Sequence, residues 1–301
     1  MKKTFTYSSE TLYAKNTPNF AGYKNINKLI KDIELPREWQ KDLKDYCDEN
    51  NIEFMSTPFD VKAVDELYNL GVKRLKIAGF EATDPRIVKY AAATKLPLII
   101  TAGIGVDLDQ IQKIIDWVVE ENSNPNLTFL HGNNAYPTPY GDVCLGQINK
   151  IKERDYSRNI SIGISDHSKG ILIPPIAVAL GATTVEKHYT LSRFLSGPDH
   201  AEHALEPSEL FDMVKNIRNV ELSMRQKTSM TNSEKKFQTA RRSIVVTKDL
   251  PVGHEISIDD ITTKRPAPPG CLEASKYYDV IGKKLKTSVA EDQVLKVGDI
   301  Q

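Results

Sequence analysis

The sequence predicts an α/β barrel, in which parallel strands alternate with helices. Six short apolar runs recur about every 25 to 30 residues through the first three quarters of the chain, which is the spacing of repeated strand–helix units. Segments with helical periodicity, such as 107–121 and 207–224, lie between or after these runs. A closed barrel needs eight strands, and six are clear from the pattern. They are Ile52–Met55, Arg74–Ala78, Pro97–Thr101, Leu127–His131, Ile160–Ile164 and Thr183–Lys187.

Polar and ionisable residues close every one of these runs. Barrel enzymes build their sites at the carboxyl ends of the strands, so the residues that follow the runs are predicted to converge on one rim. In chain order they are Ser56, Thr57, Glu81, Thr101, Asn134, Tyr136, Ser165, Asp166, His167 and His188.

Composition excludes several classes of protein. The 301 residues include 40 Lys and Arg and 40 Asp and Glu, so no basic excess points to nucleic acid or to an acidic membrane. The longest apolar stretches fall short of the roughly 20 residues of a membrane span, and no secretory signal opens the sequence. Cys47, Cys144 and Cys271 match neither a disulfide framework nor a zinc cluster. We therefore expect a cytoplasmic protein with free thiols, whose partners are small molecules or a second copy of the chain.

A change in composition near residue 225 predicts a second domain. Residues 1–225 are assigned to the barrel, 226–240 to a polar linker and 241–301 to a small, turn-rich domain. In that domain Arg241–Val246 is predicted to be a strand and Ser257–Ile261 a short helix or turn. A module of this size is either a structural or dimerisation appendage or a contributor to the active site.

Two histidines are the strongest chemical signal in the barrel. His167 and His188 follow neighbouring strands, and two neutral imidazoles with open positions for oxygen ligands suit a divalent ion such as Mn²⁺ or Zn²⁺. The alternative is that each imidazole satisfies a hydrogen bond or performs acid–base work. His200 and His203 lie further along a loop, and a surface position is expected for both.

A ring of hydroxyls, amides and one ammonium predicts an anion site. Such groups suit a phosphate or a carboxylate, although Lys76 could instead pair with Glu81 or Glu186. The residues are Ser56, Thr57, Lys76, Thr101, Asn134 and Ser165.

Several motifs in order make the chain resemble the sialic acid synthases. The small domain matches that family's antifreeze-like (SAF) module through Arg242-Ser243-Ile244-Val245, Thr263-Lys264-Arg265-Pro266 and Val280-Ile281-Gly282-Lys283. The barrel motifs are Phe54-Met55-Ser56-Thr57-Pro58-Phe59-Asp60, Lys76-Ile77-Ala78-Gly79-Phe80-Glu81, Asn134-Ala135-Tyr136-Pro137-Thr138-Pro139, Gly163-Ile164-Ser165-Asp166-His167-Ser168, Glu186-Lys187-His188-Tyr189-Thr190 and Gly197-Pro198-Asp199-His200.

The resemblance implies a transferase that uses phosphoenolpyruvate. C3 of phosphoenolpyruvate attacks the open-chain aldehyde of N-acetylmannosamine, water enters at C2, and C–O cleavage releases phosphate and a nine-carbon 2-keto sugar acid. It also implies that His167 and His188 hold Mn²⁺, with Mg²⁺ or Co²⁺ as substitutes. The implied phosphoenolpyruvate ligands are Lys76, Thr57, Thr101, Asn134 and Ser165, and the implied sugar contacts are Glu81, Tyr136, Asp199 and, from the partner of a domain-swapped homodimer, Arg265.

The resemblance also predicts what this chain lacks. Gly79 stands where the family often has Ser, and Thr101 where Ser is usual. Relatives open with a strand carrying Glu-Ile-Gly-x-Asn-His, so a TIM-type (β/α)8 barrel without its first strand–helix unit is expected here, and the natural gene product is expected to be longer or its gene disrupted. Three functions stay open: a synthase using N-acetylmannosamine, a legionaminate or pseudaminate synthase using a diacetamido hexose, and an inactive fragment that keeps only binding or dimerisation.

Overall fold

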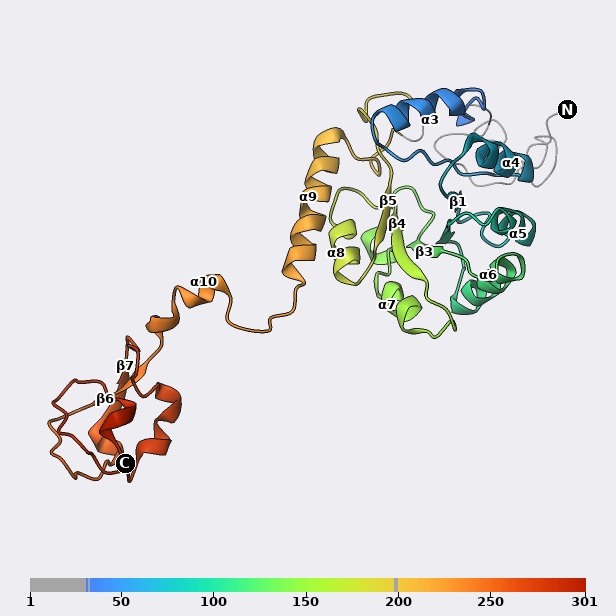
Figure 1. The fold of residues 1–301 in the computed structure, drawn as a ribbon. Helices are drawn as coiled ribbons and strands as arrows, with labels where there is room; N and C mark the ends of the chain where they lie inside the picture. Colours follow the sequence, from blue (N-terminus) through green and yellow to red (C-terminus); the bar gives the residue numbers. More distant parts are fainter. Residues whose placement is uncertain (1–30, 32, 198–199) are drawn as a thin grey trace. The chain divides into compact units, whose positions relative to one another are not determined.

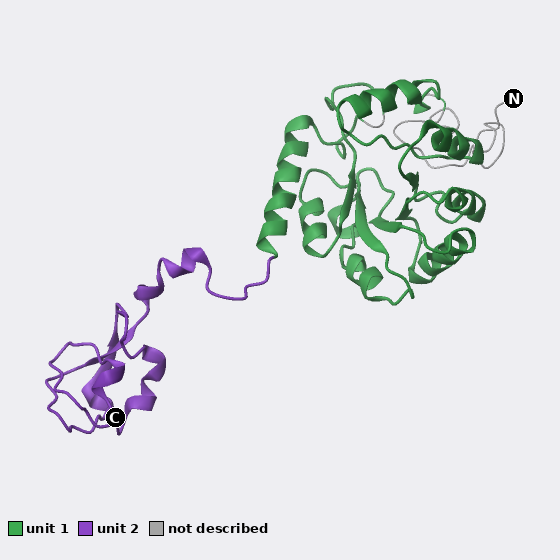
Figure 2. Ribbon diagram, viewed as in Figure 1, with its two compact units in different colours: residues 1–224 green, residues 225–301 purple. Residues whose placement is uncertain are grey.

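The chain divides into two compact units, which are described separately. The computed structural model describes residues 31, 33–197 and 200–301. Unit 1 comprises residues 1–224 and unit 2 residues 225–301 (Figure 2). The predictions about a missing first strand–helix unit and a longer gene product concern residues that lie outside the described part of the chain.

Unit 1 confirms the predicted α/β barrel architecture as a curled, half-barrel sheet. Its five described strands are parallel and follow one another in chain order, with helices around the sheet (Figure 1). Each strand lies within one or two residues of a predicted run. The strands are β1 (Leu75–Ile77), β2 (Leu98–Ala102), β3 (Leu127–Gly132), β4 (Ser161–Asp166) and β5 (Thr184–Lys187).

The strands are near-continuous apolar runs because both faces of the sheet are covered. Leu75 and Ile77 of β1 and Ile100 of β2 are fully buried, as expected of a parallel sheet between helices and barrel interior. Aspartates fix where several helices start: the Asp60 carboxylate accepts from the Ala63 amide at 2.7 Å, and that of Asp107 from the Gln110 amide at 2.8 Å. The helices are α3 (Trp39–Glu49), α4 (Val61–Leu70), α5 (Pro85–Ala93), α6 (Leu108–Glu121), α7 (Gly146–Glu153), α8 (Ile173–Ala179) and α9 (Pro207–Ser223).

One predicted strand is wrong. The segment Ile52–Met55 is irregular, and Ile52 is 62% exposed. Apolar residues form a strand only when a neighbour supplies a hydrogen-bond ladder. Within the described residues the sole register of β1 is with β2, so this segment has no such ladder.

Unit 2 has its own small core. It begins with the short helix α10 (Asn232–Lys235), and its strands β6 (Ser243–Val246) and β7 (Ile261–Lys264) pair antiparallel. A 3₁₀ turn at Ile258–Asp260 matches the predicted short helix or turn. The core residues include Ile244, Val246, Leu250, Ile256, Ile261, Leu272, Val280, Leu285, Val289 and Leu295.

None of the helices in the described ranges is both long enough and apolar enough to span a bilayer.

Candidate active site

The curl of the sheet brings its two outermost described strands together at the predicted rim. Lys76 lies on β1 and Glu186 on β5, yet the Lys76 Nζ lies 3.0 Å from the Glu186 Oε2. Lys76 is only 5% exposed. An ammonium so far from solvent needs a counter-charge, and in this structure Glu186 supplies it. The sequence offered Glu186 only as an alternative ion-pair partner, because position alone does not reveal which carboxylate faces the lysine across the barrel.

Ser165 completes this polar group from β4. Its hydroxyl donates to the Glu186 Oε1 at 2.6 Å. Burial by itself would raise the pKa of Glu186, but attraction to Lys76 and the hydrogen bonds from Ser165 and Lys76 outweigh it, so the pKa lies below its usual value. Lys76, Ser165 and Glu186 therefore form a charge-balanced cluster in which the ionised Glu186 carboxylate accepts hydrogen bonds.

A second group of side chains, in contact with one another through their aromatic rings, lies beside the first, since the His167 Nε2 is 3.5 Å from the Ser165 Oγ. The rings of His167 and His188 have centroids 5.3 Å apart, and that of Tyr136 lies 4.2 Å from His167 and 5.5 Å from His188. These residues follow β3, β4 and β5 in turn. The predicted convergence of strand ends is thus seen for the two histidines and the tyrosine.

His167 has the electronic state that a metal ligand needs. Burial lowers the pKa of this imidazole, so it is neutral at neutral pH, and neutral imidazole is the form that binds metal. Its Nδ1 contacts the Asn133 carbonyl oxygen at 2.6 Å, a bond that orients the ring, and its Nε2 faces the Ser165 Oγ at 3.5 Å. His167 and His188 fit a divalent ion that completes its coordination with substrate or water oxygens. In the described ranges no set of three or more His, Cys, Asp and Glu side chains is arranged to hold a metal.

The surface position expected for His203 is wrong. His203 is 2% exposed and packs edge-on against His188, with ring centroids 4.7 Å apart. Its centroid lies 5.4 Å from that of Tyr136. No local pattern marks this position, because it lies in the long connection between β5 and α9 and reaches the rim only through the fold. His200 contacts the Thr190 hydroxyl at 2.7 Å.

Two glycines make room for Asn134. A Cβ on Gly103 would lie 2.1 Å from the Asn134 Oδ1, and one on Gly79 would lie 3.0 Å from the same atom. A serine at position 79 would therefore crowd the amide where it now lies. Glycine in place of serine at position 79 therefore removes a hydroxyl and also makes room for the Asn134 amide.

Thr101 offers a polar atom in need of a partner. Its Oγ1 is buried and has no hydrogen-bond partner among the described residues. A buried hydroxyl without a partner costs free energy, so a bound ligand with acceptor oxygens would satisfy it.

Glu81 differs from Glu186 in its electrostatics. Burial raises the pKa of Glu81 to about 7, and the positive charge of Lys76 offsets this only in part. Its Oε2 is buried without a hydrogen-bond partner in the described part of the chain. A carboxyl that titrates near neutrality at a rim is typical of a functional site.

The sequence also predicted Thr57, Asp199 and Arg265 as site residues. Thr57 is half-buried between α3 and α4, and the described hydrogen bonds and ring contacts do not link it to the rim. Asp199 lies outside the described residues. Arg265 is exposed in unit 2, at the end of β7.

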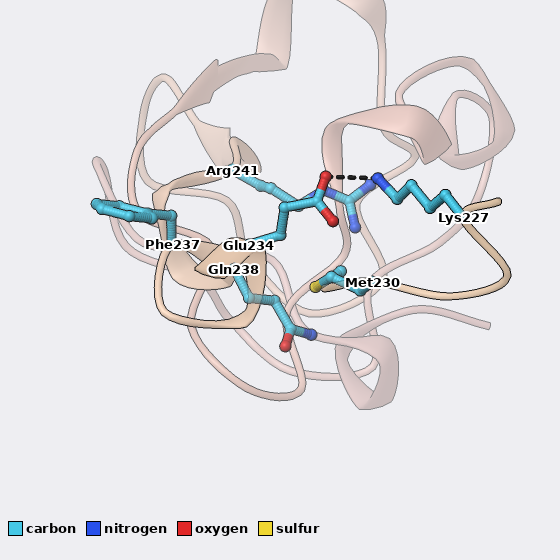
Figure 3. Close-up of a pocket in the computed structure, with 6 residues that line it drawn as sticks. All are labelled: Lys227, Met230, Glu234, Phe237, Gln238 and Arg241. Carbon is cyan, nitrogen blue, oxygen red and sulfur yellow. Dashed lines mark hydrogen bonds and ion pairs between the residues drawn. The ribbon is translucent and has the colours of Figure 1, made fainter. Parts of the chain in front are cut away.

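A separate hollow lies in unit 2 and has no histidine among its lining residues. It measures about 400 Å³, and the Lys227 ammonium pairs across it with the Glu234 carboxylate, while the Phe237 ring points away (Figure 3). Lys227 and the Thr231 backbone and hydroxyl hold the pKa of Glu234 down to about 2. The hollow is lined by Lys227, Met230, Glu234, Phe237, Gln238 and Arg241.

Comparison with known proteins covers both units. Residues 2–229 match the model of the NeuB family, and residues 241–301 match that of the SAF domain. An uncharacterized protein of Methanocaldococcus jannaschii is 38% identical over 95% of this chain and 83% of its own. The N,N'-diacetyllegionaminic acid synthase of Campylobacter jejuni is 33% identical over 89% of this chain and 79% of its own. The crystal structure of an N-acetylneuraminic acid synthetase from Leptospira borgpetersenii superposes with a TM-score of 0.63 at 32% identity, covering 69% of this chain and 71% of that one.

Proposed function

Because the chain belongs to the NeuB family, we propose that it condenses phosphoenolpyruvate with N-acetylmannosamine to a nine-carbon 2-keto sugar acid and phosphate. In the reaction, C3 of phosphoenolpyruvate forms a bond to the aldehyde carbon of the sugar, and the oxygen of one water molecule bonds to C2. Cleavage of a C–O bond then releases phosphate. The atoms of phosphoenolpyruvate, the sugar and one water molecule are all accounted for in the sugar acid and phosphate.

The observation that carries the proposal is the buried Lys76 ammonium at 3.0 Å from Glu186, beside two histidines. Phosphoenolpyruvate is a polyanion, and a buried ammonium with hydroxyls around it is a strong anion partner. Lys76, Thr101, Asn134 and Ser165 bind the phosphate and carboxylate in this scheme, with Thr57 as a further ligand. Glu186 holds Lys76 in place, and its low pKa keeps it ionised to accept a hydrogen bond from water.

His167 and His188 are the proposed holders of a divalent ion, with Mn²⁺ the first choice and Mg²⁺ or Co²⁺ as substitutes. When bound, the ion supplies Lewis-acid polarisation of the sugar aldehyde. The chain prepares for it by keeping His167 neutral and by orienting that ring through the Asn133 carbonyl.

Glu81 and Tyr136 are proposed to hold the acceptor sugar. The Glu81 Oε2, which has no hydrogen-bond partner among the described residues, is positioned to accept from a hydroxyl, and the Tyr136 ring offers an apolar face with a polar tip. Asp199, together with Arg265 from the second copy of a domain-swapped homodimer, completes the sugar site in this proposal. Arg265 suits the task because its planar fork binds an acetamido oxygen or carboxylate directionally.

A second candidate acceptor is a diacetamido hexose. The 33% identity with a diacetyllegionaminic acid synthase favours it. The two candidates share every step at the aldehyde and differ only in the acyl groups and the tail of the sugar.

The test is phosphate release from phosphoenolpyruvate by the purified protein with Mn²⁺. N-acetylmannosamine, the two diacetamido sugars and a reaction without sugar are compared. Sugar-dependent release identifies the acceptor, whereas no release with any sugar would favour the non-catalytic alternative. His188→Ala should abolish release.

A further inference from the structure

We propose that His203 is a positioning residue of this site, whose imidazole fixes the ring orientations of His188 and Tyr136. Neither the motifs of the sequence nor the resemblance assigns it a role. Its proposed effect on metal binding rests on the proposed function, whereas its effect on the two rings does not.

The backbone brings His203 to the rim. The Leu205 amide donates to the His188 carbonyl at 2.9 Å, and the Thr190 amide donates to the Leu205 carbonyl at 2.8 Å. These bonds form a parallel bridge between Tyr189 and Leu205 that extends the end of β5. His203 stands two residues before the bridge, so its backbone is tied to that of His188.

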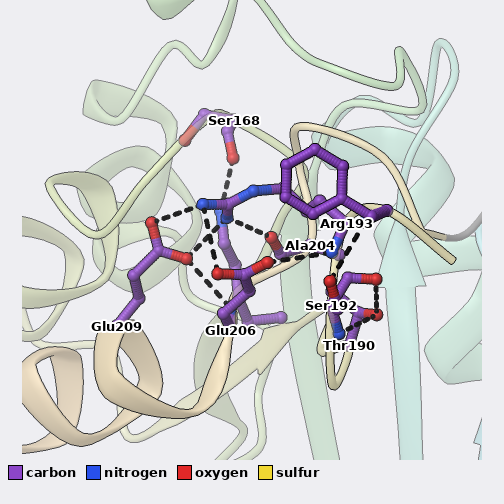
Figure 4. Close-up of polar contacts among 9 residues, drawn as sticks. Ser168, Thr190, Ser192, Arg193, Ala204, Glu206 and Glu209 are labelled. Atoms are coloured by element: carbon purple, nitrogen blue, oxygen red, sulfur yellow. Dashed lines mark hydrogen bonds and ion pairs between the residues drawn. The ribbon is translucent and has the colours of Figure 1, made fainter.

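Arg193 links the same connection to the start of α9. Figure 4 shows the Arg193 guanidinium between the Ala204 carbonyl and the start of α9. Its Nη1 donates to the Ala204 oxygen at 3.0 Å and to the Glu209 Oε2 at 2.6 Å, and the Arg193 amide donates to the Glu206 Oε1 at 2.9 Å. Glu206 and Glu209 also form the capping box of α9. The residue directly after His203 is thereby fixed to a helix end, which limits how far His203 can move.

The rings themselves make a closed triangle. His203 meets His188 at 75° and Tyr136 at 70°, and Tyr136 meets His188 at 74°. Edge-to-face contacts are the arrangement that such rings prefer. Since His203 is 2% exposed, it has little room to rotate. Each of the other two rings therefore has an immobile neighbour on one side.

Loss of that neighbour should affect function through orientation. A histidine that binds metal needs its ring aimed, and removing a residue that orients a ligand typically weakens metal binding by about 10- to 100-fold. His203→Ala should weaken Mn²⁺ binding within this range and raise the KM for the sugar more than it lowers kcat, because Tyr136 is proposed to contact the sugar.

The first measurement uses the metal-free full chain with ¹³C-labelled histidine rings. The His188 signal, assigned with His188→Gln, should move and broaden in His203→Ala, because the ring loses its packed neighbour. The control is Phe194→Ala, which removes an exposed ring from the same connection and should leave the signal unchanged. An unmoved His188 signal in His203→Ala would overturn the proposal.

The second measurement is Mn²⁺ binding followed by the electron paramagnetic resonance of free Mn²⁺. His203→Phe keeps a ring without nitrogens, so it should bind within about threefold of the wild type while His203→Ala binds at least tenfold more weakly. Phe as weak as Ala would overturn a packing role in favour of nitrogen chemistry. If His203→Ala does not fold, the Phe variant alone decides by the same threshold. Absence of Mn²⁺ binding by the wild type would instead count against the proposed function and leave the ring measurement standing.

Discussion

Glu81 in unit 1 and Asp260 in unit 2 are both carboxyl groups withdrawn from water, yet their pKa values shift in opposite directions. Burial raises the pKa of Glu81 to about 7. Burial also opposes ionisation of Asp260, but hydrogen bonds from His254, Lys248 and Ser257 outweigh it and hold its pKa well below the usual range. Donors, and not depth, decide the direction.

From this difference in pKa we expect a structural role for Asp260 and a chemical role for Glu81. Asp260 accepts from the Lys248 ammonium at 2.7 Å, the His254 Nε2 at 2.8 Å and the Ser257 amide at 2.8 Å, so it has little left to offer a ligand. Glu81 keeps one buried oxygen without a partner in the described part of the chain. Asp166 is a third buried carboxylate, and like Asp260 it already accepts from several donors.

The largest effect is expected at Asp166, which is saturated like Asp260 but lies in unit 1. Its carboxylate pairs with Lys187 at 2.8 Å, and the two side chains are 1% and 2% exposed. Lys187→Met would leave a buried charge unpaired, so the free energy of unfolding should fall by about 3 to 5 kcal/mol. Urea denaturation of the full chain measures it.

The control for this change is Lys169→Met, which breaks the surface pair between Lys169 and Glu202 and should leave the denaturation midpoint of unit 1 unchanged. A Lys187→Met protein with the wild-type midpoint would show that a saturated carboxylate at this depth is not structural.

The next effect is on catalysis. Glu81→Gln keeps the shape of the side chain but removes the charge and half of the acceptor capacity of a carboxylate that is proposed to bind a sugar hydroxyl, so kcat/KM for the sugar should fall about 10- to 100-fold. The measurement is sugar-dependent phosphate release. Glu53→Gln, at an exposed glutamate paired with Arg74, is the matched control. Full activity in Glu81→Gln would place Glu81 with the structural carboxylates.

Asp260→Asn should show the converse behaviour. The amide cannot accept from all the donors around it, so the free energy of unfolding of unit 2 should fall by about 2 kcal/mol, while phosphate release at low temperature stays at the wild-type rate. Differential scanning calorimetry follows the transition of unit 2, with the exposed neighbour in Asp259→Asn as control. Unchanged melting would remove the structural half of the comparison.

The rim shows what the sequence could predict and what it could not. Strand spacing and the polar residues after each strand predicted that His167, His188 and Tyr136 would meet, because parallel strands end at one edge. The pairing of Lys76 with Glu186 depends on how far the sheet curls, which spacing does not encode. The surface position expected for His203 is wrong because the Tyr189–Leu205 bridge and the hydrogen bond from Arg193 to the Ala204 carbonyl carry it to the rim, and no local sequence pattern marks either contact.

The same reasoning explains the error at Ile52–Met55. Its apolar run fits a strand, but a strand also requires a partner, and pairing is a property of the fold and not of the run. Apolar content predicted β1 to β5 well, and each of these strands has at least one other described strand as a neighbour.

The smallest effect is the pH dependence of stability, in which Glu81 and Asp260 should have opposite signs. The pKa of Glu81 is raised from 4.5 to about 7, so the folded state binds more protons than the unfolded state in this interval and the free energy of unfolding falls as pH rises through it. The pKa of Asp260 is lowered from 3.8, so its contribution is complete above that pH and is lost as pH falls below it. Relative to the wild type, Glu81→Gln should gain about 1 kcal/mol between pH 5 and pH 8, after screening by solvent is allowed for. Asp260→Asn should instead be less stable than the wild type above about pH 4, and this difference in the free energy of unfolding should disappear as pH falls below that value. Denaturation of both variants from below pH 4 to pH 8 tests the comparison. If the difference in free energy of unfolding between variant and wild type changed with pH in the same direction for both, donors would not set the direction of the pKa shift.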